Sequence, residues 1–146
     1  MTIAALFLST SLQFGLPQGL LESLCWVESS HNISAIHEDD GGTDSLGLCQ
    51  VKFKTAVWLG FTGTEEELMD PATNIYYAAA YLKKQLIRYH YDLPRALTAY
   101  NRGNSFHLSH SDYSDKVITQ WGLYQNEQRK QFERIFIVDI STTYGH

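Results

Sequence analysis

Residues 16–29, LPQGLLESLCWVES, determine how this chain folds and where its reactive group lies. If they form a helix, at about 100° per residue one arc collects its apolar side chains, namely Leu20, Leu21, Leu24, Cys25 and Val27. Glu28 falls inside that arc, whereas Glu22 and Trp26 point away from it. Burial disfavours the charged form of a carboxyl group and raises its pKa, which suits a general acid. The alternative is a frayed helix end that lets Glu28 reach water.

Length and charge limit the classes of function. A chain of 146 residues with 44% hydrophobic and 18% charged residues can bury one core, so we expect one globular domain. The net charge of -5 provides no cationic field for nucleic acid or for an anionic membrane. A bound polymer must therefore be held in a groove.

The N-terminal run, residues 2–16, is apolar, yet the first positive residue of the chain is Lys52 and no cleavage site is evident. We interpret this run as a first helix rather than a signal peptide, and it is too short and too polar to span a bilayer. Cys25 and Cys49 are too few to indicate a disulfide scaffold. Reduced core cysteines are the favoured interpretation, with one bridge between them left open.

Helix signals dominate the chain. Gly15 and Pro17 indicate a break and the first turn of a second helix. A long polar loop follows over residues 31–50, and loops of that length are usually functional or disordered. Residues 51–59 predict a short helix, and Thr64 with Glu67 predicts a capping box for another.

Later helices have clear start signals. Asp70 and Pro71 open a helix that we expect to reach about Tyr89, with a buried stripe of Ile75, Ala78, Ala79, Leu82 and Leu86. Another runs from Asp92 to Gly103, and residues 112–134 are expected to be helical with a weak point at Gly122. Residues 135–143, IFIVDISTT, have β character and predict a strand, a packed tail or a link to another part.

Four short motifs follow one another along the chain: Glu28-Ser29, Ser45-Leu-Gly-Leu-Cys-Gln50, Asp70-Pro-x-x-Asn74-Ile and Ala99-Tyr-Asn-x-Gly103. This order resembles the soluble lytic transglycosylase domain of the lysozyme-like superfamily, related to goose-type lysozyme. The resemblance covers residues from about 16 to 118. It implies a mainly α, lysozyme-like domain with a catalytic groove and little or no β-sheet. We expect a single domain over residues 1–146, with residues 119–146 as a C-terminal extension.

The resemblance also implies site residues. Glu28 matches the catalytic acid of the family. Substrate-binding positions are implied at Ser45, Cys49, Gln50, Tyr100, Asn101 and Tyr113. Two departures stand out, because Cys49 replaces the usual Met and Ser109 replaces a frequent Glu. The plainer interpretation makes Tyr100 and Tyr113 ordinary half-buried tyrosines and Gln50 a loop-capping amide.

The implied reaction cuts peptidoglycan between N-acetylmuramic acid and N-acetylglucosamine and forms a 1,6-anhydro sugar. It needs one carboxyl group and neither metal nor organic cofactor. One alternative is a hydrolytic muramidase that adds a loop carboxylate from Asp39, Asp40 or Asp44. Another is a glycan-binding module without catalysis. His107, His110 and Asp112 match no metal-ligand spacing, so we expect no metal site there.

The expected partner is a peptidoglycan strand, with no nucleic acid and no membrane-spanning segment, and we expect a monomer. Action on the bacterial wall, in the periplasm or outside the cell, requires a route of delivery. Because no signal peptide is evident, we expect a bacteriophage lysis or virion protein, or a bacterial domain whose leader has been removed.

Overall fold

The computed structural model describes residues 1–38 and 42–144, with side chains as far as Ile137. The described residues form a mainly helical body with one small sheet, as predicted. The helices are α1 (Ile3–Phe14), α2 (Leu20–Ser29), α3 (Phe53–Trp58), α4 (Glu65–Leu68), α5 (Pro71–Arg88), α6 (Leu93–Arg102) and α7 (Asp112–Tyr144). The antiparallel sheet has the order β1 (Ile36–His37), β2 (Ser45–Leu46) and β3 (Val51–Lys52).

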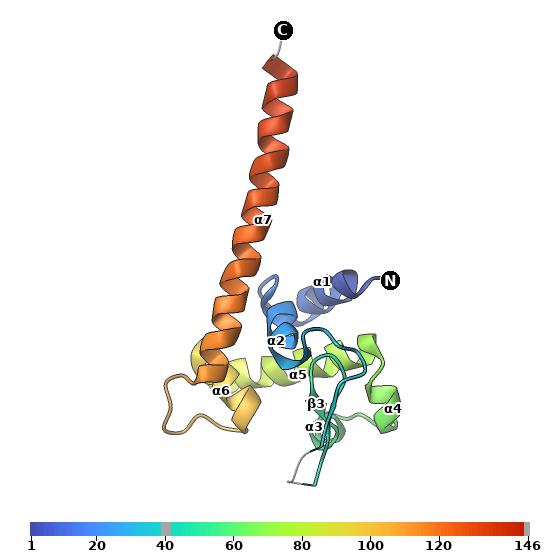
Figure 1. Cartoon of the computed structure of the whole chain (residues 1–146). Helices are drawn as coiled ribbons and strands as arrows, with labels where there is room; N and C mark the ends of the chain where they lie inside the picture. The colour runs from blue at the N-terminus through green and yellow to red at the C-terminus, as the bar shows by residue number, and fades with distance from the viewer. Residues whose placement is uncertain (39–41, 145–146) are drawn as a thin grey trace.

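Helix α5 crosses the body and packs against α1 and α6, while the first part of α7 packs against α2 and α6 (Figure 1). The core between them is made of fully buried aliphatic side chains, including Leu20, Leu21, Leu24, Ile75, Leu82 and Leu97. The stripe predicted for α5 is buried throughout, so the periodicity of this segment identified its core face.

The predicted helix starts are largely confirmed. The Asp70 carboxylate accepts from the Thr73 N–H at 3.0 Å, and the capping box of Thr64 and Glu67 is present. The expected start of the second helix is wrong by one turn. Pro17 lies in the turn before α2, where its carbonyl accepts from the Leu20 N–H at 3.2 Å.

The buried side-chain amide of Asn74 holds the loop between β2 and β3 in place by hydrogen bonds. The Asn74 Oδ1 accepts from the Cys49 N–H at 2.8 Å, and its Nδ2 donates to the carbonyls of Leu46 and Leu68. Gly47 lies so close to this amide, at φ +74°, that a Cβ there would stand 2.6 Å from Nδ2. The glycine and the asparagine of two separate motifs thus form one structural unit.

Cys25 and Cys49 form a disulfide, so the favoured expectation of reduced cysteines is wrong. Both side chains are fully buried where the loop held by Asn74 meets α2. Two cysteines that are 24 residues apart give no sign in the sequence that the loop folds back onto the helix. The bridge joins the helix that carries Glu28 to the loop that carries Gln50.

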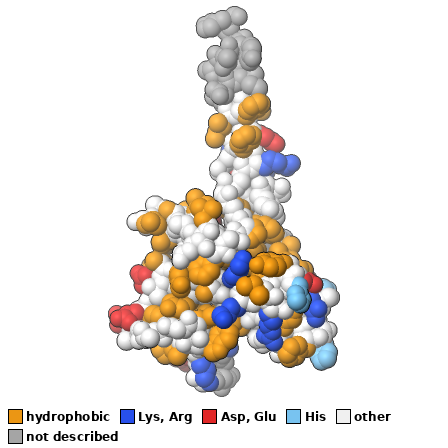
Figure 2. Space-filling view, turned by 180° about the vertical axis from the view of Figure 1, so that it is seen from behind, with side chains coloured by type: hydrophobic (Ala, Val, Ile, Leu, Met, Phe, Trp, Pro, Cys, Tyr) orange, Lys and Arg blue, Asp and Glu red, His pale blue; other side chains and the backbone are white. Residues whose placement is uncertain are grey.

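The expected β character of residues 135–143 is also wrong. Helix α7 continues without a break at Gly122 and includes this segment up to Tyr144. Its outer part stands clear of the body and carries hydrophobic side chains (Figure 2). Local β preference does not decide the structure here, because the preceding helix supplies the hydrogen-bonded turn on which the next residues propagate. None of the helices in the described part of the chain has an apolar run long enough to cross a bilayer.

We predict that the disulfide contributes about 3 kcal/mol to the free energy of unfolding, because it closes a loop of 24 residues in the unfolded chain. Urea denaturation of the wild type with and without reductant measures this difference. The Cys25→Ala/Cys49→Ala variant is the control, since reductant should leave its transition unchanged. An equal response of both proteins to reductant would contradict the prediction.

Candidate active site

Glu28 lies in the last turn of α2, on the side of the helix that carries Leu21 and Leu24. The helix is intact through Ser29, so the frayed end considered from the sequence does not occur. The Ser29 hydroxyl donates to the Leu48 carbonyl at 2.7 Å and accepts from the Asn32 N–H at 3.0 Å. These bonds fix the helix end against the loop and hold Glu28 in place.

The carboxyl group of Glu28 contacts a residue 85 positions away. The Tyr113 hydroxyl, in the first turn of α7, donates to Glu28 Oε1 at 2.6 Å. Burial raises the pKa of Glu28 from 4.5 to about 7, and the bond from Tyr113 opposes part of that rise. Desolvation prevails, so protonated and ionised forms are both populated near neutral pH.

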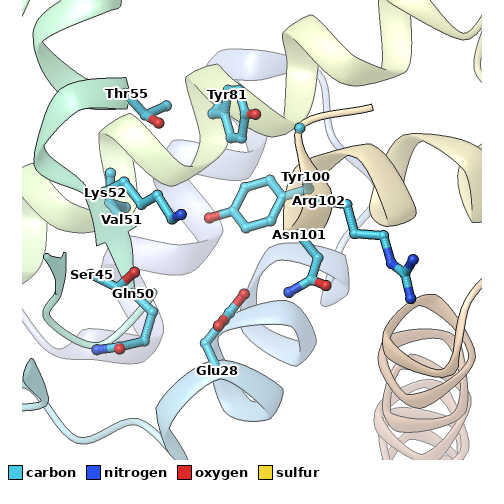
Figure 3. A pocket seen from close by; sticks show the side chains of 11 residues that line it. Glu28, Ser45, Gln50, Val51, Lys52, Thr55, Tyr81, Tyr100, Asn101 and Arg102 are labelled. Carbon is cyan, nitrogen blue, oxygen red and sulfur yellow. The ribbon is translucent and has the colours of Figure 1, made fainter. Parts of the chain in front are cut away.

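A cleft of about 260 Å³ opens above Glu28 between two walls (Figure 3). Ser45, Gln50 and Lys52 come from the small sheet and its loop, with Thr55 of α3 beside them. Tyr100, Asn101 and Arg102 come from the end of α6, and Tyr81 of α5 closes the cleft away from Glu28 (Figure 3). Among the residues described as lining it, Glu28 is the one carboxylate.

Tyr100 reaches across the cleft. Its ring packs on Tyr81 with centroids 5.1 Å apart, and its hydroxyl donates to the Cys49 carbonyl at 3.5 Å. Burial and the negative charge of Glu28 raise the pKa of Tyr100 well above its ordinary value. The hydroxyl therefore keeps its proton and is a donor at the cleft surface.

The other predicted site residues take different places. Gln50 lines the cleft, but its amide nitrogen donates to the carbonyls of Gly47 and Ala35 at 2.8 and 3.1 Å. Its backbone has a φ of 50°, so the amide also stabilises an unusual turn. Ser45 and Asn101 line the cleft. Tyr113 reaches Glu28 without lining the cleft.

Cys49 does not fit its expected place as a residue of the groove wall. Its side chain is fully buried in the disulfide, and only its carbonyl faces Tyr100. The position is thus structural, since it ties the loop to α2.

Six residues of the cleft lining were not predicted as site residues: Val51, Lys52, Thr55, Tyr81, Arg102 and Gly103. A signal existed for four of them. Val51 and Lys52 directly follow the motif that ends at Gln50. Arg102 and Gly103 belong to the motif that begins at Ala99, whereas Tyr81 lies outside the four motifs. Thr55 could not be found without the position of α3.

No group of three or more His, Cys, Asp or Glu side chains comes together in the described ranges in a way that could hold a metal ion. His110 instead pairs with Asp115 on the surface, with Nδ1 and Oδ2 3.1 Å apart.

The helical body and small sheet have the fold of a lytic transglycosylase. An inactive mutant of the lytic transglycosylase Slt from Pseudomonas aeruginosa superposes with a TM-score of 0.71 at 19% identity. That match covers 86% of this chain but only 24% of the larger protein.

The family follows from the sequence comparison. The chain belongs to the Transglycosylase SLT domain family, whose model matches residues 5–120. It is also similar to Protein IpgF of Shigella flexneri, with 28% identity over 95 residues. This match covers 64% of the chain and 62% of that protein, so the chain spans less than two thirds of this relative.

We predict that Glu28→Gln stabilises the protein at high pH. Between pH 4.5 and about 7 the unfolded chain loses the carboxyl proton while the folded protein keeps it. The free energy of unfolding of the wild type therefore falls as pH rises, by about 3 kcal/mol in all. The glutamine variant has no carboxyl group at this position, so its free energy of unfolding does not fall for this reason.

Urea denaturation of both proteins at about pH 4 and about pH 8 measures the difference. The two should be similar at the lower pH, and the variant should be the more stable at the higher pH. A variant that is less stable than the wild type at the higher pH would contradict burial as the cause of the raised pKa.

Proposed function

We propose that this domain is a peptidoglycan lytic transglycosylase that uses Glu28 as its single general acid and base. It cleaves the β-1,4 bond between N-acetylmuramic acid and N-acetylglucosamine and leaves a 1,6-anhydro end. The observation that carries the proposal is the one carboxyl group among the described cleft residues, with a pKa of about 7. Family membership supports it, and so does a fold neighbour that is inactive as a glutamate-to-glutamine mutant.

The first step needs a proton on Glu28. Because Oε1 accepts from Tyr113, the proton belongs on Oε2. Glu28 donates it to the glycosidic oxygen as the bond to the muramyl C1 breaks. The 2-acetamido group of the substrate stabilises the positive centre at C1, so no second carboxylate is required.

The second step uses the same group in reverse. The ionised Glu28 accepts the proton of the muramyl C6 hydroxyl while that oxygen bonds to C1. The proton returns to Glu28, no water is consumed, and the enzyme is restored. A group with a pKa near the working pH performs both transfers well, since neither protonation state is strongly disfavoured.

The surrounding residues support this chemistry by position. We assign Ser45, Asn101 and Tyr100 to substrate binding, because all three line the cleft. Gln50 shapes the wall and leaves its amide oxygen for the sugar, while Tyr113 holds the carboxyl group.

Hydrolysis by the same fold would need a carboxylate that activates water. Asp39 and Asp40 lie outside the described residues. Asp44 is described, and its carbonyl accepts from the Phe53 N–H at 3.2 Å, but it is absent from the described cleft lining. The described part of the cleft therefore favours the mechanism with one carboxyl group.

The substrate places the site of action at the bacterial cell wall, in the periplasm or outside the cell. We propose a monomer acting on glycan strands, delivered as a bacteriophage lysis or virion protein or by export of a bacterial protein. Genes for phage structural or lysis proteins beside this gene would support the first route.

We predict that wild-type protein releases muropeptides with 1,6-anhydro ends, which are one water lighter than reducing ends. Mass spectrometry of the released fragments measures this. Glu28→Gln should lose activity by at least about 10³-fold while it stays folded, because it cannot donate a proton. Reducing ends alone would point to hydrolysis, and no release by either protein would point to a non-catalytic module.

We predict that Tyr113→Phe moves the alkaline limb of the pH profile of kcat/KM to higher pH. The hydrogen bond from the Tyr113 hydroxyl lowers the pKa of Glu28, and the phenylalanine variant lacks it, so the pKa of Glu28 rises further. Tyr77→Phe is the control, because Tyr77 packs against Phe61 and Tyr76. An alkaline limb that moves to lower pH in Tyr113→Phe would refute this role of the tyrosine.

A further inference from the structure

A second hollow of about 460 Å³ lies on the face formed by α3 and α5. Its walls are Trp58, Lys84, Gln85, Ile87 and Arg88. None of these residues takes part in the chemistry assigned to Glu28. The indole of Trp58 is 67% exposed, which is unusual for the largest apolar side chain.

This hollow lies beside the cleft along two helices. Thr55 of the cleft and Trp58 of the hollow are three residues apart on α3, and Tyr81 and Gln85 are four apart on α5. Residues at these spacings lie on one side of a helix. The Gln85 side chain also lies close enough to the Tyr81 hydroxyl to influence it, at the boundary of the two sites. The hollow around Trp58 therefore lies next to the end of the cleft that Tyr81 closes.

The charges along this path are nearly all positive. Lys52 and Arg102 line the cleft, and Lys84 and Arg88 line the hollow. The described acid on the path is Glu28, which is about half protonated near neutral pH. Although the chain as a whole has a net charge of -5, four of its 11 Lys and Arg residues line these two sites, and Glu28 is the one acid among the described lining residues. Such a path attracts an anionic ligand.

These cations act away from the acid. Burial and the Tyr113 bond account for the shifted pKa of Glu28. Burial also raises the pKa of Tyr81, and the charges of Arg88 and Lys52 oppose part of that rise. Two of the four cations therefore lie close enough to Tyr81, at the boundary of the two sites, to act on its hydroxyl. A general acid needs this separation, because a cation beside it would favour its ionised form.

The hollow is also formed in advance. Lys84 Nζ lies 4.9 Å from the centroid of the Trp58 ring. Arg88 donates to the Gly103 carbonyl at 3.0 Å and lies over the ring of Phe106. Lys84 is thus held at the indole, and Arg88 is held by other partners within the lining of the same hollow, so less ordering is required when a ligand binds.

We propose that the hollow around Trp58 binds an acidic peptide stem carried by the glycan strand whose bond lies at Glu28. Lys84 and Arg88 pair with carboxylates of the stem, and Trp58 packs against its apolar atoms. This inference rests on the proposed function, and it adds a site that distinguishes strands with stems from strands without them.

The test measures binding rather than turnover. In the Glu28→Gln protein, we compare solubilised glycan strands that carry stems with the same strands after an amidase has removed the stems. Trp58→Ala/Lys84→Ala in that background should bind the strands with stems about tenfold more weakly. Its affinity for the bare strands should be unchanged. Both side chains are exposed, so the variant should keep its fold, which its thermal transition checks.

Lys83→Ala in the same background is the matched control. Lys83 is the neighbour of Lys84 on α5, but its Nζ lies over the ring of Tyr91, 5.2 Å from the centroid. Its removal should leave both affinities unchanged. If Lys83→Ala weakens binding as much as the double variant, general surface charge is responsible and the proposed site is refuted.

Three other results separate the possible failures. Unchanged affinity of the double variant for strands with stems refutes the site around Trp58 and leaves the proposed function intact. An equal loss on both kinds of strand shows that the hollow binds the glycan itself, which overturns the assignment to the stem. A Glu28→Gln parent that binds neither kind of strand overturns the proposed function and this inference with it.

Discussion

The structure depends on keeping one carboxyl group away from water. Glu28 lies on the apolar side of α2, and its burial raises the pKa to about 7 against the opposing bond from Tyr113. This arrangement is unfavourable for stability above neutral pH, because the folded protein then holds a desolvated charge. It persists only if the elements around Glu28 are held firmly. An acid that costs stability and faces a cleft is typical of a site selected for function.

Three connections hold these elements together. The disulfide joins α2 to the loop of Cys49, and Asn74 joins the same loop to α5. The packing of α7 against α2 then brings Tyr113 to the carboxyl group. Four segments of the chain are thus connected to one another around Glu28. The cations that line the cleft, Lys52 and Arg102, are not among the causes of the shifted pKa of Glu28.

The sequence predicted the local features of this design well. Periodicity placed Glu28 on the buried arc, capping residues located most helix starts, and the ordered motifs predicted the family. It could not predict contacts between distant segments. The disulfide and the Tyr113 bond both depend on how the loop and α7 fold back onto α2. Residues 135–143 show the opposite error, since a local β preference was overruled by the helix that precedes them.

The state of Glu28 in the folded protein is the central claim, and a pH titration followed by carbon NMR of its side-chain carboxyl measures it directly. We predict a single transition near pH 7, well above the ordinary value of 4.5. A transition close to that ordinary value would mean that water reaches the group freely. Burial of Glu28 could then explain neither the cleft, nor the mechanism with one carboxyl group, nor the cost to stability.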